Sequence, residues 1–266
     1  MIATAIRGAA RLPAAALFVS LGLGAASAQE IDLDVPYVPT PARVVDKMLE
    51  LATVKEGDVV IDLGSGDGRI AIAAAKRGAR AYGVDINPVR VKEAVENAQK
   101  EGVAERATFR EQNLFDTNIT QAQVITMYLL PSVNRDLRPR LLDLTPGTRV
   151  VSHAFDMGDW LPDERAVVDG KNVYFWKVPA KVDGRWAVEH GGDTVNLILT
   201  QTYQRLSGTA DMGGKNSPVE GSLDGDLVTL SFGEGEARRE LRGRVNGSTL
   251  EPIAGSSAGS WTARRG

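Results

Sequence analysis

The sequence contains no cysteine, and its only two histidines, His153 and His190, stand far apart in 266 residues. The absence of cysteine excludes disulfides, thiolate nucleophiles and zinc sites built on cysteine. Two separated histidines do not form the clustered pattern that a histidine-rich metal site requires. We therefore expect no metal cofactor.

The sequence also lacks an excess of basic charge. It has 31 Lys and Arg against 34 Asp and Glu, which gives a formal net charge of −3. Proteins that bind nucleic acid through its phosphates are usually basic, so this balance predicts no nucleic-acid partner. A hydrophobic fraction of 43% allows a full core in one large domain or two moderate ones.

Long apolar runs are scarce, and the main one lies at the N-terminus. Arg7 and Arg11 precede an apolar stretch (12–24), which is followed by the A-x-A pattern at residues 26–28. This order predicts a signal peptide over residues 1–28, because the stretch is shorter than the roughly 20 residues that span a bilayer. We expect an exported, periplasmic protein. The alternative is an uncleaved membrane anchor, which leaves open a place on the cytoplasmic side for the rest of the chain.

Strand and helix patterns alternate from about residue 34 to residue 179. "VVIDLG" is a continuous apolar run typical of a strand buried on both faces, and the helical "RIAIAAAKRG" follows it. Thr40 with Pro41 predicts the N-cap and first turn of one helix, and Asn87 with Pro88 those of another. The alternation predicts the α/β class, with a mainly parallel sheet covered by helices on both faces.

The pattern changes from about residue 173, where polar and apolar residues begin to alternate. Asp183-Gly184, Asp224-Gly225 and Asn246-Gly247 predict hairpin turns, since Asp-Gly and Asn-Gly favour them. We expect a small antiparallel all-β domain over residues 181–266, as a barrel or a sandwich. The segment "TADMGGKNSPVEG" is expected to form loops.

The motif "DLGSGDG" (62–68) joins the first predicted strand to a helix. A dinucleotide fingerprint would need a third glycine where Arg69 stands, and a P-loop would need G-K-[ST], which is missing. The acid at Asp62 can pair with an ammonium, and Asp85 closes the second strand where an acid accepts ribose hydroxyls. This pattern predicts S-adenosylmethionine as the cofactor.

"VVIDLGSGDGR" with "GVDINP" resembles the Rossmann-like methyltransferases. "VPYVPTP", "QNLFDTNIT", "MYLLPSVN" and "PGTRVVSHAFDMGDW" narrow the resemblance to one lysine methyltransferase family. Its mitochondrial members act on the ATP synthase c-subunit and the adenine nucleotide translocase. The resemblance implies a methyltransferase domain over residues 29–180 and a protein substrate, for which membrane association is an expectation from the mitochondrial members.

The resemblance also implies the residues of the site. The cofactor-binding residues it implies are Tyr37, Thr40, Asp62, Gly64, Ser65, Gly66, Asp85, Asn113 and Leu114. Asn113 and Leu114 would lie near the adenine, and Tyr37 and Thr40 would form a lid segment. For Thr40, the helix cap is an equally good interpretation.

Three residues are candidates for the acceptor side of the site. Tyr128 follows the fourth predicted strand, at the sheet edge where parallel sheets bind ligands, and is the first candidate for the acceptor channel. His153 could accept a proton or be a buried histidine bonded to backbone, and Asp156 could orient an ammonium or cap a turn. Asp159 and Trp160 should face the same edge.

Three functions stay open at this point. The first is transfer of a methyl group to lysine in a protein, and the second is methylation of a small molecule by the same fold. The third is a non-enzymatic binding protein acting through the β domain. Retained cofactor binding separates the first two from the third. The sequence does not indicate the oligomeric state.

Overall fold

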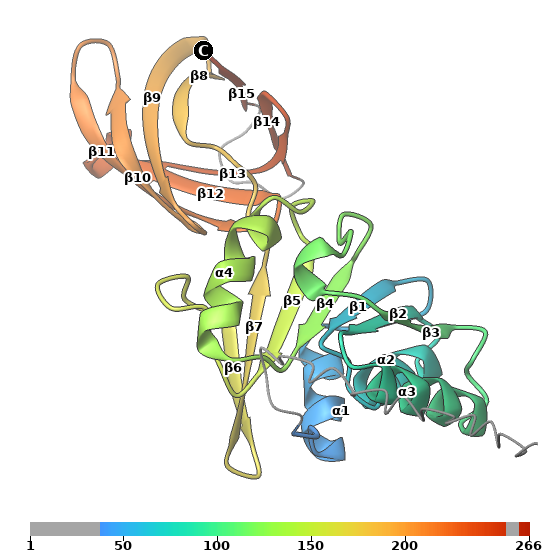
Figure 1. Cartoon of the computed structure of the whole chain (residues 1–266). Helices are drawn as coiled ribbons and strands as arrows, with labels where there is room; N and C mark the ends of the chain where they lie inside the picture. Colours follow the sequence, from blue (N-terminus) through green and yellow to red (C-terminus); the bar gives the residue numbers. More distant parts are fainter. Residues whose placement is uncertain (1–37, 254–260) are drawn as a thin grey trace, which may run out of the picture. The chain divides into compact units, whose positions relative to one another are not determined.

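The computed structural model describes residues 38–253 and 261–266. The predicted signal peptide (1–28) and Tyr37 lie outside the described residues. The described chain forms a seven-stranded sheet with helices, followed by a closed eight-stranded barrel (Figure 1). This architecture confirms the predicted fold class. None of the helices described is both long and apolar enough to traverse a bilayer.

The sheet has the strand order β3-β2-β1-β4-β5-β7-β6. Its strands are β1 (Val59–Leu63), β2 (Arg80–Asp85), β3 (Ala107–Glu111), β4 (Val124–Met127), β5 (Arg149–His153), β6 (Glu164–Val168) and β7 (Lys171–Lys177). Strands β1 to β5 pair in parallel, whereas β7 is antiparallel to both β5 and β6. Strand order reverses between β1 and β4, and the carboxyl ends of strands at such a point form a ligand crevice.

Helices cover both faces of this sheet. They are α1 (Ala42–Leu51), α2 (Arg69–Lys76), α3 (Pro88–Lys100) and α4 (Pro131–Leu142), with the short 3-10 helices η1 (Leu114–Asp116) and η2 (Gly235–Ala237) elsewhere in the chain. All five residues of β1 are buried, and neighbouring side chains point to opposite faces. Val60 packs in the core with α1 and α2, whereas Ile61 packs in the core with α4. A strand sandwiched in this way is expected to be apolar at nearly every position, as "VVIDL" is except at Asp62.

One predicted helix cap is confirmed and one is wrong. Asn87 caps α3, since its side chain accepts a hydrogen bond from the Val89 N–H at 3.0 Å. The N-cap of α1 is Pro41, whose carbonyl accepts from two helical N–H groups and whose side chain forms no cap. Thr40 does not cap, because its hydroxyl bonds to the buried His153 instead.

The barrel buries a separate apolar core. Its strands are β8 (Gly184–His190), β9 (Asp193–Thr202), β10 (Arg205–Asp211), β11 (Asn216–Asp224), β12 (Leu227–Phe232), β13 (Arg239–Asn246), β14 (Thr249–Pro252) and β15 (Trp261–Arg265). Pairing of β15 with β8 closes the cylinder, so no edge strand is left. Inward side chains from all eight strands fill the interior, Trp186 and Trp261 among them.

Two of the predicted hairpin turns are confirmed, and two other predictions are wrong. The turns at Asp224-Gly225 and Asn246-Gly247 join paired neighbouring strands. Asp183-Gly184 leads into the barrel rather than turning a hairpin, because the preceding strand belongs to the other sheet. Most of "TADMGGKNSPVEG" is strand, with only residues 212–215 between β10 and β11. Strand pairing overrides its turn-like composition.

The β9–β10 turn contacts the segment that follows β5. The Tyr203 hydroxyl donates to Asp159 at 2.8 Å, and its ring stacks on Trp160 with centroids 6.1 Å apart. Arg138 of α4 lies over the Tyr203 ring, 5.5 Å from its centroid. These contacts hold Asp159 and Trp160 in place, and neither residue lines the pocket described next.

Candidate active site

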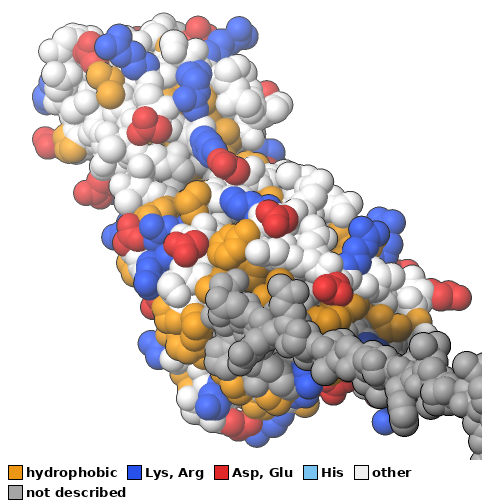
Figure 2. Space-filling view, viewed as in Figure 1, with side chains coloured by type: hydrophobic (Ala, Val, Ile, Leu, Met, Phe, Trp, Pro, Cys, Tyr) orange, Lys and Arg blue, Asp and Glu red, His pale blue; other side chains and the backbone are white. Residues whose placement is uncertain are grey.

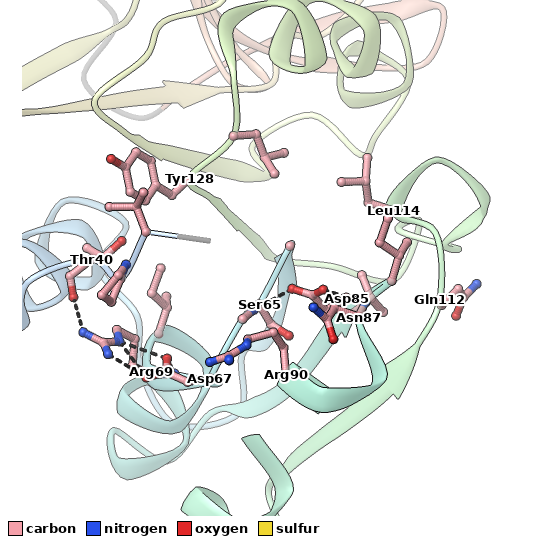
Figure 3. Close-up of a pocket in the computed structure, with 18 residues that line it drawn as sticks. Thr40, Ser65, Asp67, Arg69, Asp85, Asn87, Arg90, Gln112, Leu114 and Tyr128 are labelled. Atoms are coloured by element: carbon pink, nitrogen blue, oxygen red, sulfur yellow. Dashed lines mark hydrogen bonds and ion pairs between the residues drawn. The ribbon is translucent and has the colours of Figure 1, made fainter. Parts of the chain in front are cut away.

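A cavity open to solvent lies at the carboxyl ends of β1, β2 and β4 (Figure 3). Its walls include seven of the predicted site residues, which are Thr40, Gly64, Ser65, Gly66, Asp85, Leu114 and Tyr128. In Figure 3, Tyr128 and Thr40 lie across the cavity from Asp85 and Leu114. The fold therefore brings residues from distant parts of the sequence to the edge where parallel sheets bind ligands.

The glycine motif forms the floor of this cavity. Gly64, Gly66 and Gly68 have φ values of +74°, +52° and +81°, a region that residues with a side chain rarely adopt. The loop turns back on β2, since the Gly64 and Ser65 N–H groups both donate to the Val84 carbonyl at 2.9 Å. Helix α2 begins directly after the loop, so its positive end faces the cavity.

Asp62 lies beneath this loop at 1% exposure. Its Oδ1 accepts a hydrogen bond from the Thr126 hydroxyl at 2.6 Å, and its Oδ2 has no hydrogen-bond partner among the described residues. Burial raises the pKa of Asp62 to about 7, and Asp85 and Asp67 add to the rise, against the hydrogen bond from Thr126. A buried carboxylate with an unused oxygen is suited to a cationic ligand group.

Asp85 is fixed in place by the backbone around it. Its Oδ2 accepts from the Gly66 N–H and its Oδ1 from the Asn87 N–H, both at 2.9 Å. The residue ends β2 and is half-buried at the wall of the cavity. Each carboxylate oxygen keeps acceptor capacity, because one carboxylate accepts about four hydrogen bonds. Such a carboxylate can bind a pair of neighbouring hydroxyls.

The predicted adenine neighbours differ in their placement. Leu114 lines the cavity, whereas Asn113 is exposed and caps η1 by accepting from the Phe115 N–H at 2.9 Å. Gln112, which sequence reasoning missed, lines the cavity instead. It directly follows β3 and begins the motif "QNLFDTNIT", from which only Asn113 and Leu114 were predicted to lie in the site. The contact between Asn113 and adenine stays a prediction.

On the opposite wall, the Tyr128 ring packs on His153 with centroids 3.9 Å apart. His153 is 1% exposed, and its Nδ1 lies 3.1 Å from the Thr40 hydroxyl, whereas its Nε2 is unpartnered among the described residues. Burial lowers the pKa of His153 to about 4, and the charge of Lys171 contributes. His153 is therefore neutral at physiological pH, and its partner is a side chain rather than the expected backbone group.

Asp156 does not line the cavity. It is exposed, and its Oδ1 accepts from the Gly158 N–H at 3.0 Å, so it caps a turn. Of the two roles that the sequence left open, the structure shows the turn cap. The other role, orientation of an ammonium, has no support from its position.

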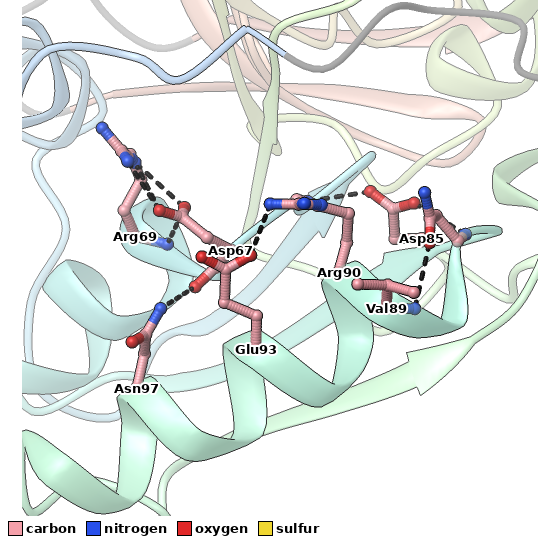
Figure 4. Close-up of polar contacts among 9 residues, drawn as sticks. Asp67, Arg69, Asp85, Val89, Arg90, Glu93 and Asn97 are labelled. Carbon is pink, nitrogen blue, oxygen red and sulfur yellow. Dashed lines mark hydrogen bonds and ion pairs between the residues drawn. The ribbon is translucent and has the colours of Figure 1, made fainter.

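Arg69 is a second residue that sequence reasoning missed (Figure 4). It binds both carboxylate oxygens of Asp67, and its Nη1 donates to the Thr40 carbonyl at 2.9 Å. Asn97 of α3 donates to the Asp67 carbonyl at 2.9 Å. Arg69 thus joins the segment before α1 to the glycine loop, from the position where a dinucleotide fold would need its third glycine.

These features fit S-adenosylmethionine. Asp62 does not itself line the cavity, but its unpartnered oxygen beneath the loop would face the α-ammonium, and Asp85 would offer acceptors to the two ribose hydroxyls. Leu114 and Ile86 would supply an apolar wall for the adenine. Gly64 and Gly66 line the cavity, and the amino-acid tail of the cofactor would lie against their backbone. Fold and site together define an S-adenosylmethionine-dependent methyltransferase.

Comparison with known proteins agrees with this class. Residues 62–164 match the ANTKMT methyltransferase domain. A protein-lysine N-methyltransferase from Saccharolobus islandicus is 50% identical over 142 residues, which are 52% of this chain and 88% of that protein. The adenine nucleotide translocase lysine N-methyltransferase of Mus musculus is 37% identical, over 49% of this chain and 57% of that protein. The chain thus spans little more than half the length of the mouse protein.

One solved structure extends the comparison. The crystal structure of an RNA methyltransferase from Salinibacter ruber, in complex with S-adenosyl-L-homocysteine, is 54% identical. The match covers 55% of this chain and 96% of the Salinibacter chain, with a TM-score of 0.53. The chain belongs to the lysine methyltransferase family that the Saccharolobus and mouse proteins represent.

Proposed function

We propose that this protein transfers the methyl group of S-adenosylmethionine to the side-chain amine of a lysine in another protein. The observation that carries the proposal is the 50% identity to a protein-lysine N-methyltransferase over 88% of that protein. The site described above also has the groups needed to hold the cofactor.

The residues of the site divide the work between two ligands. Asp62 binds the ammonium of the cofactor, Asp85 holds its ribose, and Tyr128 lies at the wall where an acceptor enters. The bound cofactor supplies an electrophilic methyl group on a sulfonium. The contribution of the protein is to align donor and acceptor and to exclude water.

A lysine acceptor must be neutral before it can attack. Its reference pKa is about 10.4, and a site with low polarity lowers the pKa of an amine by desolvation. Tyr128 offers an apolar ring face, and His153 beside it is neutral, so neither ring repels the amine or adds a positive charge. The lysine ammonium loses its proton to solvent as it moves onto the Tyr128 ring face.

The proposal is tested by locating the transferred methyl group. The full chain is incubated with methyl-labelled S-adenosylmethionine and cell protein that has been freed of RNA, and labelled residues are located by mass spectrometry. We expect label on lysine Nζ atoms, and no label with the Asp85→Ala variant. Label on other side chains alone, or no transfer by a wild-type chain that binds cofactor, contradicts the proposal.

The description of the Salinibacter protein as an RNA methyltransferase makes RNA the second candidate acceptor. The composition argues against it, since the formal net charge is −3 and phosphate contacts need basic residues. On the face that Figure 2 shows, Lys and Arg side chains are mixed with Asp and Glu rather than gathered in a stripe. The same assay with purified RNA as acceptor decides between them.

We further propose that the lysine belongs to a membrane-associated protein and that the chain is exported or anchored by residues 1–28. The support is the apolar N-terminal stretch and the resemblance to the mitochondrial family members. Fractionation of cells that express the tagged full chain tests the location. Recovery of all the protein in the cytoplasmic fraction at full length contradicts it.

A further inference from the structure

The chain makes a strained turn directly after β5. The Phe155 N–H donates to the His153 carbonyl at 2.8 Å, two residues back, and Ala154 between them has a φ of +67°. A γ-turn with a positive φ at a residue other than glycine is rare and costs free energy. Strain of this kind persists only where the surrounding structure imposes it.

Three neighbours impose this turn. The Ala154 N–H donates to the Asn172 carbonyl of β7 at 2.8 Å. The Phe155 carbonyl accepts from the Ser152 hydroxyl at 2.7 Å and from Asn134 Nδ2 of α4 at 3.2 Å. Asn134 and Ser152 are both fully buried. The sheet and α4 thus hold the turn from opposite sides.

The turn sets two rings against Tyr128. His153 lies 3.9 Å from the Tyr128 ring centroid, and Phe155 stacks at 6.2 Å with an interplanar angle of 23°. Tyr128 also lines the cofactor cavity, so Tyr128 and Phe155 form one aromatic surface that starts at the cavity. This surface is called the aromatic wall below.

The aromatic wall is not part of the apolar core of the sheet. Tyr128 and Phe155 are both half-buried, and neither belongs to the core clusters formed by the described residues. Phe155 does not line the cavity itself but stacks on Tyr128, which does. A strained turn that keeps such a ring half-exposed suggests a role in binding a ligand rather than in packing.

We propose that the aromatic wall binds the aliphatic stem of the acceptor lysine, with Phe155 as a specificity-determining residue and His153 and Ala154 as positioning residues. This inference rests on the proposed function. Four methylene groups of a lysine can lie along the two ring faces while the amine reaches the cavity. The hydrogen bond between Thr40 and His153 fixes the His153 ring, which packs against Tyr128.

The test measures binding of a lysine probe directly. The full chain is labelled with 3-fluorotyrosine, loaded with S-adenosylhomocysteine and titrated with the peptide acetyl-Gly-Gly-Lys-Gly-Gly-amide, with the Tyr128 fluorine signal assigned by Tyr128→Phe. We expect a saturable shift of this signal in the wild type. Phe155→Leu should weaken peptide affinity about tenfold and leave the affinity for S-adenosylhomocysteine unchanged. A wild type without a saturable shift, or a Phe155→Leu variant with wild-type affinity, overturns the proposal.

Two further variants separate specificity from stability. Phe232→Leu makes the same change at a buried ring in the barrel, and should leave peptide affinity unchanged. Ala154→Gly relieves the positive φ, so we expect a higher Tm together with weaker peptide binding as the turn loosens. A higher Tm with unchanged peptide binding overturns the positioning role of the turn.

The outcome is distinguishable from failure of the proposed function. If methyl label reaches lysine but Phe155→Leu binds the peptide as tightly as the wild type, only this inference fails. If the label reaches RNA instead, the proposed function fails, whatever the peptide does.

Discussion

Thr40 and His153, 113 residues apart in the chain, are joined by a hydrogen bond of 3.1 Å between Oγ1 and Nδ1. Thr40 lines the cofactor cavity, and His153 packs on Tyr128. Arg69 holds the Thr40 carbonyl from the glycine loop. Thr40 therefore connects the part of the site that binds cofactor to the part that we propose binds the acceptor.

We expect Thr40→Val to destabilise the protein by about 1–3 kcal/mol, because it keeps the shape of the side chain but leaves His153 Nδ1 buried without its partner. Thr40→Ser, which keeps the hydroxyl, is the matched control and should lose less. Urea unfolding of the full chain measures both. A larger loss for Thr40→Ser than for Thr40→Val would mean that packing of the methyl group, not the hydrogen bond, is what counts.

Cofactor affinity should depend on pH through Asp62. The pKa of Asp62 is raised to about 7, and the ammonium of the cofactor favours the ionised form. Below that pH, Asp62 has to release a proton when the cofactor binds. The dissociation constant should therefore rise up to about tenfold for each unit by which the pH falls. Calorimetric titration between about pH 5.5 and pH 8, in two buffers of different ionisation enthalpy, measures affinity and proton release together.

Two variants check that Asp62 is the group responsible. Thr126→Val removes the hydrogen bond that lowers the pKa of Asp62, so the bend in the profile should move to higher pH. Asp62→Asn should bind weakly at every pH and show no bend. A bend that survives in Asp62→Asn would assign the titration to another group.

His153 should contribute to the pH dependence of the free energy of unfolding, and the sign of this contribution follows from its pKa shift. The pKa of His153 is lowered from 6.5 to about 4, so between these values the unfolded state binds more protons than the folded state. This contribution stabilises the fold as pH rises toward 6.5 and is lost as pH falls toward 4, at about 1.4 kcal/mol per pH unit. Asp62, whose pKa is raised from 3.8 to about 7, contributes the opposite slope over nearly the same range.

The contributions of His153 and Asp62 should therefore nearly cancel, so that together they change the wild-type free energy of unfolding little as pH varies. In His153→Asn, which removes the titrating imidazole, it should fall as pH rises from about 5 to 6.5 relative to the wild type. In Asp62→Asn it should rise over the same interval. Denaturant unfolding at several pH values measures these slopes, and parallel curves for all three proteins would contradict the assignment.

The sequence was sufficient for the features that depend on local chemistry. The glycine loop, the Asn87 cap and the turn at Asn246-Gly247 each follow from neighbouring residues, and all three are present. Predictions failed where a distant partner decides. Thr40 has the composition of a cap, but His153 binds its hydroxyl, and the turn-like residues after Thr209 pair as strands across a barrel that local patterns do not reveal.

The same limit applies to the site. Asp62, Asp85 and Tyr128 stand at strand ends, which a periodic pattern locates, so they could be chosen from the sequence. Phe155 could not, because its role comes from a turn that β7 and α4 impose. Gln112 and Arg69 stand inside quoted motifs, but nothing in those motifs marked them as site residues, and only the folded chain brings them to the cavity.

Gly83 of β2 packs beneath the glycine loop, and a substitution there tests how this packing affects the site. A Cβ at this position would lie 2.5 Å from the Phe109 ring and 2.7 Å from Ser65 Cβ. Gly83→Ala should therefore cost about 1–3 kcal/mol by overpacking and weaken cofactor binding, because Ser65 lines the cavity. Adding Phe109→Leu frees the larger of the two contacts, so the double variant should recover part of the stability but less of the affinity, since Ser65 is still displaced. Urea unfolding and calorimetric titration of the two single variants and the double variant complete this double-mutant cycle. Strictly additive losses of stability would show that Phe109 and Gly83 do not interact.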